Sequence, residues 1–344
     1  MNNKNLKEPL LPPAIGLTVR NTKAPPSKTI KPATAWNRVV FGGRKKKLIY
    51  AAGKGDLSLV RELIEDYGID IDSVTSDYGI TALIAASELG QLEIVRYLVE
   101  HGANVNAVKV DSGATALMLA CQNGHLEVVR CLVEHGADLN AASTNGGATA
   151  LMCASDEGHL EIVRELLANG ANVNAAMTTD GKTSLMWAAD TDHLEVMREL
   201  LAHGANVNAA RTNDGTTTLM RACMIGKSQR ETRYMMEKVR CLVEHGADLN
   251  AVSTNGGSTA LMIACGYGHL EVVRYLCQNG ADATITDENG NMAIFYNFKK
   301  DPDIRNILLE GCSSQAKGGY YRRIRCTRRH KKHSKHATRL RKRK

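Results

Sequence analysis

Histidine and cysteine carry the most versatile side-chain chemistry in this sequence, and both recur at a fixed spacing. Imidazoles and thiolates act as proton carriers, nucleophiles and metal ligands. One catalytic centre has no use for a residue that recurs along the whole chain, so we predict structural roles for the repeated histidines. Eight of the eleven histidines occupy two positions of a pattern that repeats about every 34 residues: His125, His159, His193 and His269 at one, and His101, His135, His203 and His245 at the other.

The cysteines are also mostly periodic, and no two of them form a CxxC pair. Periodic placement favours small packed thiols in a reducing compartment over a disulfide framework or a metal site. We therefore expect an intracellular protein, in the cytoplasm, the nucleus or both. Six of the nine cysteines follow the repeat: Cys121, Cys223, Cys265, Cys131, Cys241 and Cys153.

One cluster near the C-terminus has the residue types of a metal site, namely Cys326, His330, His333 and His336. The residues between them are nearly all cationic, which repels a divalent ion, and their spacing fits no standard zinc pattern. The sequence also contains no glycine-rich phosphate loop, HExxH or GxSxG motif. We predict no metal, no cofactor and no enzymatic activity.

The net charge of +8 conceals a segregation of charge along the chain. Residues 1–47 contain 11 Lys or Arg and one acidic residue, and residues 317–344 contain 14 Lys or Arg and no acidic residue. The segment between them contains 19 Lys or Arg and 35 Asp or Glu. The three parts therefore carry +10, +14 and −16. Two basic ends flank an acidic body, which is a charge pattern typical of interaction tails.

The elements that position these residues follow from the repeat itself. The stretch Thr115–Ala141, TALMLACQNGHLEVVRCLVEHGADLNA, recurs with small changes five more times. Successive copies start 34 residues apart, except that the last step is 42 residues. Such self-similarity predicts a solenoid of stacked units, none of which can bury its apolar face alone. The other copies start at Thr81, Thr149, Thr183, Thr217 and Thr259.

Within one unit the pattern predicts two short antiparallel helices followed by an extended polar loop. Thr115 is placed to cap the first helix, and Leu117 lies on the inward face of that helix. Gly124 separates the two helices, and Val129 belongs to the apolar stripe of the second. Gly136 then ends the second helix with a left-handed residue.

The full pattern, G-x-T-A-L-M-x-A-x-x-x-G-H-L-E-V-V-R-x-L-V-E-H-G-A-D-L-N-A, resembles the ankyrin repeat over residues 47–311. The Thr-Pro-Leu-His of that family is Thr-Ala-Leu-Met or a close variant here. The resemblance implies an all-α solenoid of about eight helix–turn–helix units with extended finger loops, in a monomer whose concave face binds a partner protein. The expected units are 47–80, 81–114, 115–148, 149–182, 183–216, 217–258 with an insertion, 259–291 and 292–311.

Three units depart from the pattern. The first has Lys47 in place of the usual threonine, as expected of a terminal unit with a polar outer side. The sixth holds eight extra residues between Ile225 and Val239, which predict either a second helix that starts about two turns early or a plain loop. The last has Met292 in the threonine position and Pro302 at the start of its second helix, and we expect it to be a C-terminal cap.

Positions that vary between otherwise similar units are the candidates for partner binding. The residue four places after each threonine changes from unit to unit, and acidic or aromatic residues follow it three or four places later. Trp, Tyr and Arg are enriched at binding hot spots, which places the expected centre at Trp187, Arg221 and Tyr267. The candidate partner-binding residues are Leu119, Cys153, Asp156, Glu157, Trp187, Asp190, Arg221, Ile263 and Tyr267.

The two ends of the chain predict disorder and targeting. Residues 1–46 hold six of the seven prolines, and residues 312–344 lack apolar periodicity. The basic tail has three interpretations: a nuclear-import signal read by an importin, a weak contact with nucleic acid or an anionic membrane, or an internal partner of the acidic body. The targeting residues would be Arg328, Arg329, Lys331, Lys332, Arg339, Arg341, Lys342, Arg343 and Lys344.

Taken together, the sequence predicts a protein-interaction scaffold or adaptor that holds one partner on a concave surface and uses its basic tails for targeting. Two alternatives stay open. One is a nuclear or nucleic-acid-associated regulatory factor that uses the C-terminal tail. The other is an effector that an intracellular microbe delivers into a host cell.

Overall fold

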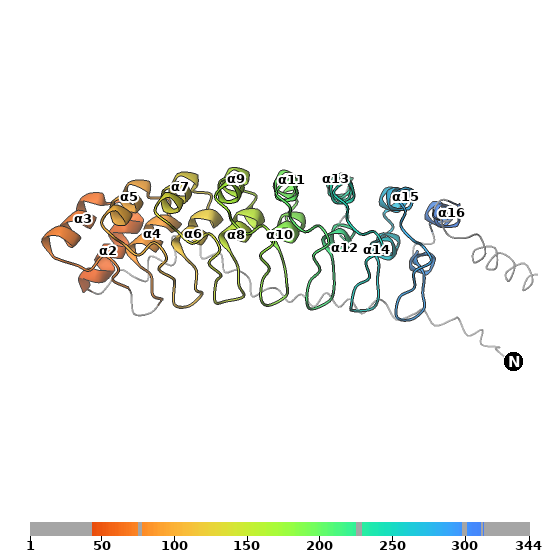
Figure 1. Cartoon of the computed structure of the whole chain (residues 1–344), viewed down its shortest axis with the longest axis horizontal. Coiled ribbons are helices and arrows are strands. Elements are labelled where there is room, and N and C mark those ends of the chain that lie inside the picture. Colours follow the sequence, from red (N-terminus) through yellow and green to blue (C-terminus); the bar gives the residue numbers. More distant parts are fainter. Residues whose placement is uncertain (1–42, 75–77, 225–228, 298–300, 311, 313–344) are drawn as a thin grey trace, which may run out of the picture.

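The computed structural model describes residues 43–74, 78–224, 229–297, 301–310 and 312, with the side chains of 229–232 excepted. The expected leader therefore lies outside the described residues apart from 43–46, and the expected tail lies outside them apart from Cys312. The described residues form an all-α chain with no β-strand, only isolated bridges between finger loops. Figure 1 shows the units side by side, with first and second helices in two rows and all finger loops on one side.

Each unit contains a first and a second helix, as the repeat predicts. In chain order the pairs are α2 (Gly43–Lys54) with α3 (Leu57–Arg61) and the π-helix η1 (Glu62–Asp66), α4 (Ala82–Glu88) with α5 (Leu92–Glu100), α6 (Ala116–Gln122) with α7 (Leu126–Glu134), α8 (Ala150–Glu157) with α9 (Leu160–Ala168), α10 (Ser184–Asp190) with α11 (Leu194–Ala202), α12 (Thr218–Ala222) with α13 (Gln229–Glu244), α14 (Ala260–Tyr267) with α15 (Leu270–Gln278), and the 3₁₀ helix η2 (Ala293–Tyr296) with α16 (Pro302–Glu310). We number these pairs as units 1 to 8.

The recurring threonine caps the first helix. The hydroxyl oxygen of Thr115 accepts a hydrogen bond from the amide of Met118 at 3.2 Å, which satisfies one of the free amides at the helix start. Units 2, 4, 6 and 7 have the same cap. In unit 5 the hydroxyl of Thr183 is buried without a partner among the described residues. The methionine in the position of the family's histidine is buried in every case, so it contributes apolar packing instead.

Gly124, between the two helices of its unit, packs closely against the histidine of the next unit. Gly124 has φ +78°, and a Cβ placed on it would lie 2.7 Å from the ring of His159. That ring fills the space and places Nε2 3.3 Å from the carbonyl oxygen of Gln122 in the preceding unit. Glycine is thus required both for its left-handed backbone and for the close approach. The structural role predicted for this histidine position matches these contacts between units.

A ladder of asparagine side chains joins the base of each finger loop to the next. The side-chain oxygen of Asn174 accepts a hydrogen bond from the amide of Asn206 at 2.7 Å, and its amide nitrogen donates to the carbonyl of Gly204 at 3.1 Å. The equivalent residue Asn106 makes the same two bonds two units earlier in the stack. Each unit therefore satisfies backbone groups of its neighbour, in addition to sharing an apolar core with it.

The outer face of the second helices carries a second ladder, made of arginines. Arg130 bonds Glu127 on its own helix at 2.8 Å and Glu165 on the next second helix at 3.0 Å. Arg164 repeats the arrangement with Glu161 and Glu199. Both arginines are solvent-exposed, so these pairs contribute little to stability.

Unit 1 differs from the other units at its start. Helix α2 begins at Gly43, so the exposed Lys47 lies inside the helix and not at the capping position that threonine occupies in units 2 to 7. The physical reason is that lysine has no side-chain oxygen with which to stop the helix there. Pro302, in contrast, is the first residue of α16, the position where proline is tolerated, as predicted.

The insertion in unit 6 lengthens the second helix, which confirms the helical interpretation over a plain loop. Helix α13 has 16 residues, whereas its counterpart α11 has nine. By alignment Met236 takes the place of Leu194, the first residue of α11, so the helix starts seven residues early, which is about two turns.

Two further residues in this region differ from the repeat pattern, and their side chains contact each other. Lys238 stands where α11 has the buried Val196, and Asp192 stands where other units have a left-handed glycine such as Gly158. The Lys238 side chain is only 1% exposed, and its ammonium donates to the carboxylate of Asp192 and to the carbonyl of Ala189. Asp192 keeps the left-handed backbone, with φ +65°. The sequence pattern alone did not reveal this pair.

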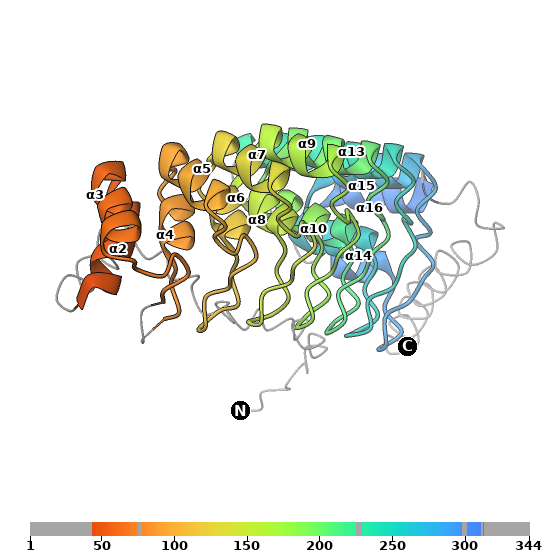
Figure 2. The same ribbon diagram turned by 60° about the vertical axis from the view of Figure 1, so that its left-hand side comes forward.

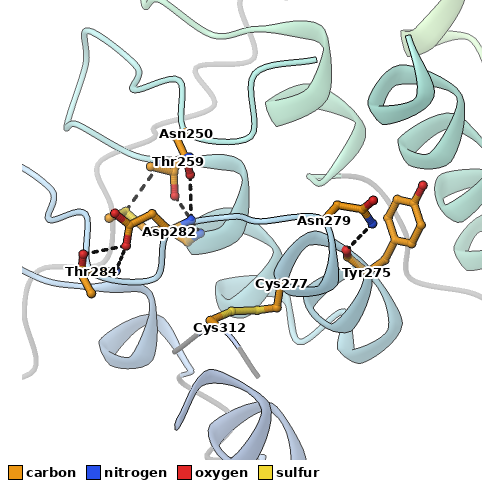
Figure 3. Close-up of a disulfide and its surroundings, with 9 residues drawn as sticks. Asn250, Thr259, Tyr275, Cys277, Asn279, Asp282, Thr284 and Cys312 are labelled. Atoms are coloured by element: carbon orange, nitrogen blue, oxygen red, sulfur yellow. Dashed lines mark hydrogen bonds between the residues drawn. A yellow bond between two sulfur atoms is a disulfide. The ribbon is translucent and has the colours of Figure 1, made fainter. Parts of the chain in front are cut away.

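The cysteines follow the packing prediction with one exception. The six periodic cysteines are free thiols, and burial raises the pKa of Cys223 to about 12, which keeps its thiol protonated. Cys277 and Cys312, however, form a disulfide with a Cα–Cα distance of 4.8 Å (Figure 3). The preference for packed thiols over disulfides is therefore wrong for this pair. It joins α15 to the residue that ends the last unit.

The repeat pattern does not indicate this disulfide, because its two cysteines occupy positions where other units have no cysteine. Cys277 takes the place of Val243, and the amide of Cys312 donates to the carbonyl of Ile307 as Ala281 donates to Leu276 in the preceding unit. In other units these two positions hold an aliphatic residue and alanine, so neither cysteine belongs to a periodic set.

The asparagine ladder predicts a measurable coupling between units. Asn174→Ala removes two hydrogen bonds across an interface, so we expect the free energy of unfolding to fall by about 1–2 kcal/mol. Urea unfolding followed by circular dichroism measures this. The matched control is Asn213→Ala at an exposed finger position, where the side chain makes no hydrogen bond within the described part of the chain. Equal unfolding midpoints for the two variants would contradict the role of the ladder.

The Lys238–Asp192 pair predicts that a double variant regains the stability that a single substitution loses. Asparagine at position 192 can adopt the same left-handed backbone, but it leaves the buried ammonium of Lys238 without a counter-charge. We therefore expect Asp192→Asn to lower the free energy of unfolding by about 1–3 kcal/mol, a range that allows for the partial exposure of Asp192. Changing both residues to those of other units, Asp192→Gly with Lys238→Val, should return stability to within about 1 kcal/mol of the unmodified chain. Thermal and urea unfolding test this. A double variant as unstable as Asp192→Asn would refute the pairing.

Candidate partner-binding surface

The residues expected along the first helices fall into two groups. Leu119 and Ile263 are only 9% and 3% exposed and belong to the shared core, so the surface exposure expected of them is not found. Their aliphatic side chains pack back into the stack. Cys153, Trp187 and Arg221, at the equivalent positions of units 4 to 6, remain partly exposed. The accessible part of this row therefore lies in the middle of the solenoid.

Trp187 lies against a charged side chain that belongs to a network of ion pairs. The ammonium of Lys182, from the finger loop that precedes α10, lies 3.1 Å from the centroid of the Trp187 ring and 2.9 Å from a carboxylate oxygen of Asp190. The other oxygen of Asp190 accepts a hydrogen bond from the guanidinium of Arg221, in unit 6, at 3.1 Å. We call Asp156, Lys182, Trp187, Asp190 and Arg221 the ion–aromatic cluster. It spans three consecutive units.

Lys182 is a residue that sequence reasoning missed. It precedes the capping threonine of unit 5, where the equivalent residues are Ala148, Thr216 and Ser258. A lysine among small residues is the signal in the sequence that marks this position. In the structure Lys182 links Trp187 to Asp190 and so organises the cluster.

The charges of the cluster are partly desolvated. Burial lowers the pKa of Lys182, and the neighbouring carboxylates of Asp190 and Asp156 partly offset that effect. Burial raises the pKa of Asp156, which the charge of Lys182 partly offsets. Asp156 forms no ion pair within 4 Å in the part of the chain that the structure describes. The cluster thus contains one half-buried carboxylate without a close cationic partner, an arrangement that costs stability.

The remaining predicted residues lie around this cluster or apart from it. Glu157 is exposed beside Asp156 at the end of α8. Tyr267 is 43% exposed at the end of α14, where its ring stacks on His269, and no described contact joins it to the cluster. A second finger-loop pair, Arg211 with Asp180, lies next to the cluster in sequence and was also not predicted.

Two kinds of feature are absent from the part of the chain that the structure describes. No group of three or more His, Cys, Asp or Glu in the described ranges could hold a metal ion. No described helix is long and apolar enough to cross a bilayer. The targeting residues Arg328–Lys344 and the cluster from Cys326 to His336 lie outside the described residues.

The raised pKa of Asp156 predicts a stabilising substitution. A carboxylate whose folded pKa exceeds its unfolded value destabilises the native state above that pKa, and the penalty disappears as pH falls through it. Asp156→Asn should therefore raise the melting temperature at pH 7 by roughly 1–2 °C. The gain should shrink as the pH is lowered through the folded pKa of Asp156, because the unmodified carboxyl then becomes protonated and neutral in the native state. Calorimetry at pH 7 and at a series of lower pH values tests this, and a loss of stability at pH 7 would contradict the account of burial.

The comparisons with known proteins agree with the geometry. A family model described as ankyrin repeats (3 copies) matches residues 43–109, 106–177, 140–211, 175–231, 210–287 and 230–317, which together cover the whole solenoid. No individual curated protein matches the chain. Ankyrin repeats generally mediate protein–protein interaction and are typically not enzymes. The continuous match over residues 43–317, together with the eight stacked helix pairs, shows that the chain belongs to the ankyrin repeat family.

Proposed function

We propose that this chain is a scaffold or adaptor that binds one partner protein through the ion–aromatic cluster on the first-helix side of units 4 to 6. The supporting observation is that several departures from the repeat meet at one place. Lys182, Trp187 and Arg221 each replace a different residue type found in neighbouring units, yet all three contact one another or the shared carboxylate of Asp190. Independent surface drift would scatter such changes over the solenoid.

The cluster has the physical properties of a binding hot spot. Trp187 offers a large aromatic surface that remains partly accessible, and Arg221 has a side chain 31% exposed. Both are already oriented, Trp187 by the ammonium of Lys182 and Arg221 by Asp190. A partner that docks here therefore orders few additional side chains, which lowers the entropic cost of association. Trp and Arg in such settings contribute a large share of binding energy.

The scaffold supports this role through its rigidity. The cluster stands on short helices whose apolar faces are buried between neighbouring units, and its residues come from α8, α10, α12 and one finger loop. Figure 2 shows α8 and α10 in the row of first helices, with the second helices above them and the finger loops below. Side chains fixed on such elements keep their relative positions better than side chains on isolated loops.

The test is capture of partners by the intact chain, identified by mass spectrometry. Trp187→Ala combined with Arg221→Ala should reduce capture of the specific partner at least about tenfold, because two hot-spot side chains are lost. The matched control, Glu127→Ala with Glu161→Ala, changes two exposed residues on the outer helices. We expect that control to capture the partner normally. Undiminished capture by the Trp187 and Arg221 variant would show that the binding surface lies elsewhere.

A further inference from the structure

We propose that the basic C-terminal segment 317–344 of this chain docks on its own solenoid at the ion–aromatic cluster, and thereby competes with a partner for that surface. The inference uses the surface named in the proposed function but requires no partner. Three observations carry it: an acidic side of the cluster without a cationic partner, finger loops and first helices of units 7 and 8 that contain no Lys or Arg, and the place where the segment starts.

The cluster has acidic groups that lack cationic partners. Asp190 is neutralised by Lys182 and Arg221, whereas half-buried Asp156 and exposed Glu157 form no ion pair in the described structure. A half-buried carboxylate gains most from a charge-assisted contact when a cation reaches it. Lys182 shows that an ammonium is compatible with Trp187 and a carboxylate at this site. The surface therefore fits lysine and arginine side chains.

The last two units present no repelling charge between the segment and this site. Residues 247–269 and 279–297, which form the finger loops and first helices of units 7 and 8, contain four acidic residues and no Lys or Arg. The exposed ring of Tyr267 lies on this route and can stack against a guanidinium. The segment itself contains 14 Lys or Arg and no acidic residue. Its charge is complementary to units 7 and 8, and the cations nearer the acidic side of the cluster, Arg211 and Arg221, are already paired with Asp180 and Asp190.

The starting point of the segment makes this contact intramolecular. Cys312, the last described residue, is buried and joined by the disulfide to α15 at the end of unit 8 (Figure 3). Four unit spacings separate unit 8 from Asp156 and Glu157 in unit 4, which amounts to roughly 40 Å. A segment of 28 residues spans up to about 90 Å when extended, so it reaches the cluster easily. Tethering of this kind corresponds to an effective concentration of the order of millimolar.

The experiment uses the full chain with Trp36→Phe, so that Trp187 is the only tryptophan, and with a protease site inserted after Ala316. Quenching of Trp187 by neutral acrylamide is measured before and after cleavage and removal of the segment. We expect the quenching constant to rise about twofold on cleavage, and equally in the uncleaved chain at 500 mM salt, because salt screens the contact. Circular dichroism must stay the same across these conditions.

Matched variants locate the contact. In the uncleaved chain, Asp156→Asn with Glu157→Gln should already show the higher quenching constant. Glu100→Gln with Glu134→Gln removes the same charge from the outer helices and should behave like the unmodified chain. Quenching that neither cleavage nor salt changes would overturn the proposal, as would equal responses of the two variant pairs. Since no partner is present, these results are independent of partner capture.

Discussion

The contact between neighbouring units is the interaction on which the whole structure depends. One unit has apolar residues on both sides of its helix pair and cannot bury them alone, so folding requires the stack. The contact combines a shared core, the hydrogen bond from His159 to the preceding unit, and the asparagine ladder through Asn174. Each of these features demands the same residue in every copy. This requirement explains why the sequence repeats so closely.

The same requirement makes departures from the repeat informative. Lys182 and Asp156 place charges where burial disfavours them, and the buried Lys238 replaces an aliphatic residue. Groups that are costly to the fold tend to mark functional sites, although structural ion pairs also occur. The structure separates the two cases. Lys238 is enclosed between Asp192 and the backbone, whereas the cluster around Trp187 remains partly open to solvent.

The sequence predicted the fold well because the fold is periodic. The capping threonines, the left-handed glycines and the place of Pro302 all follow from local rules. The arrangement of the candidate site followed from the sequence only in part. Position in the repeat singled out Trp187, Asp190 and Arg221, which lie close together in the structure, but it could not show that Leu119 and Ile263 are buried in the core or that Lys182 contacts both Trp187 and Asp190. Those facts depend on packing between units, as does the disulfide of Cys277.

Hydroxyl-radical footprinting of the intact chain with and without its captured partner tests the central claim most directly, because it reports the exposure of individual side chains. The account predicts that partner binding protects Trp187 strongly and leaves Tyr67 and Tyr78 unchanged, since these two exposed tyrosines lie in the N-terminal part of the solenoid. Protection of Tyr67 or Tyr78 with no change at Trp187 would contradict it.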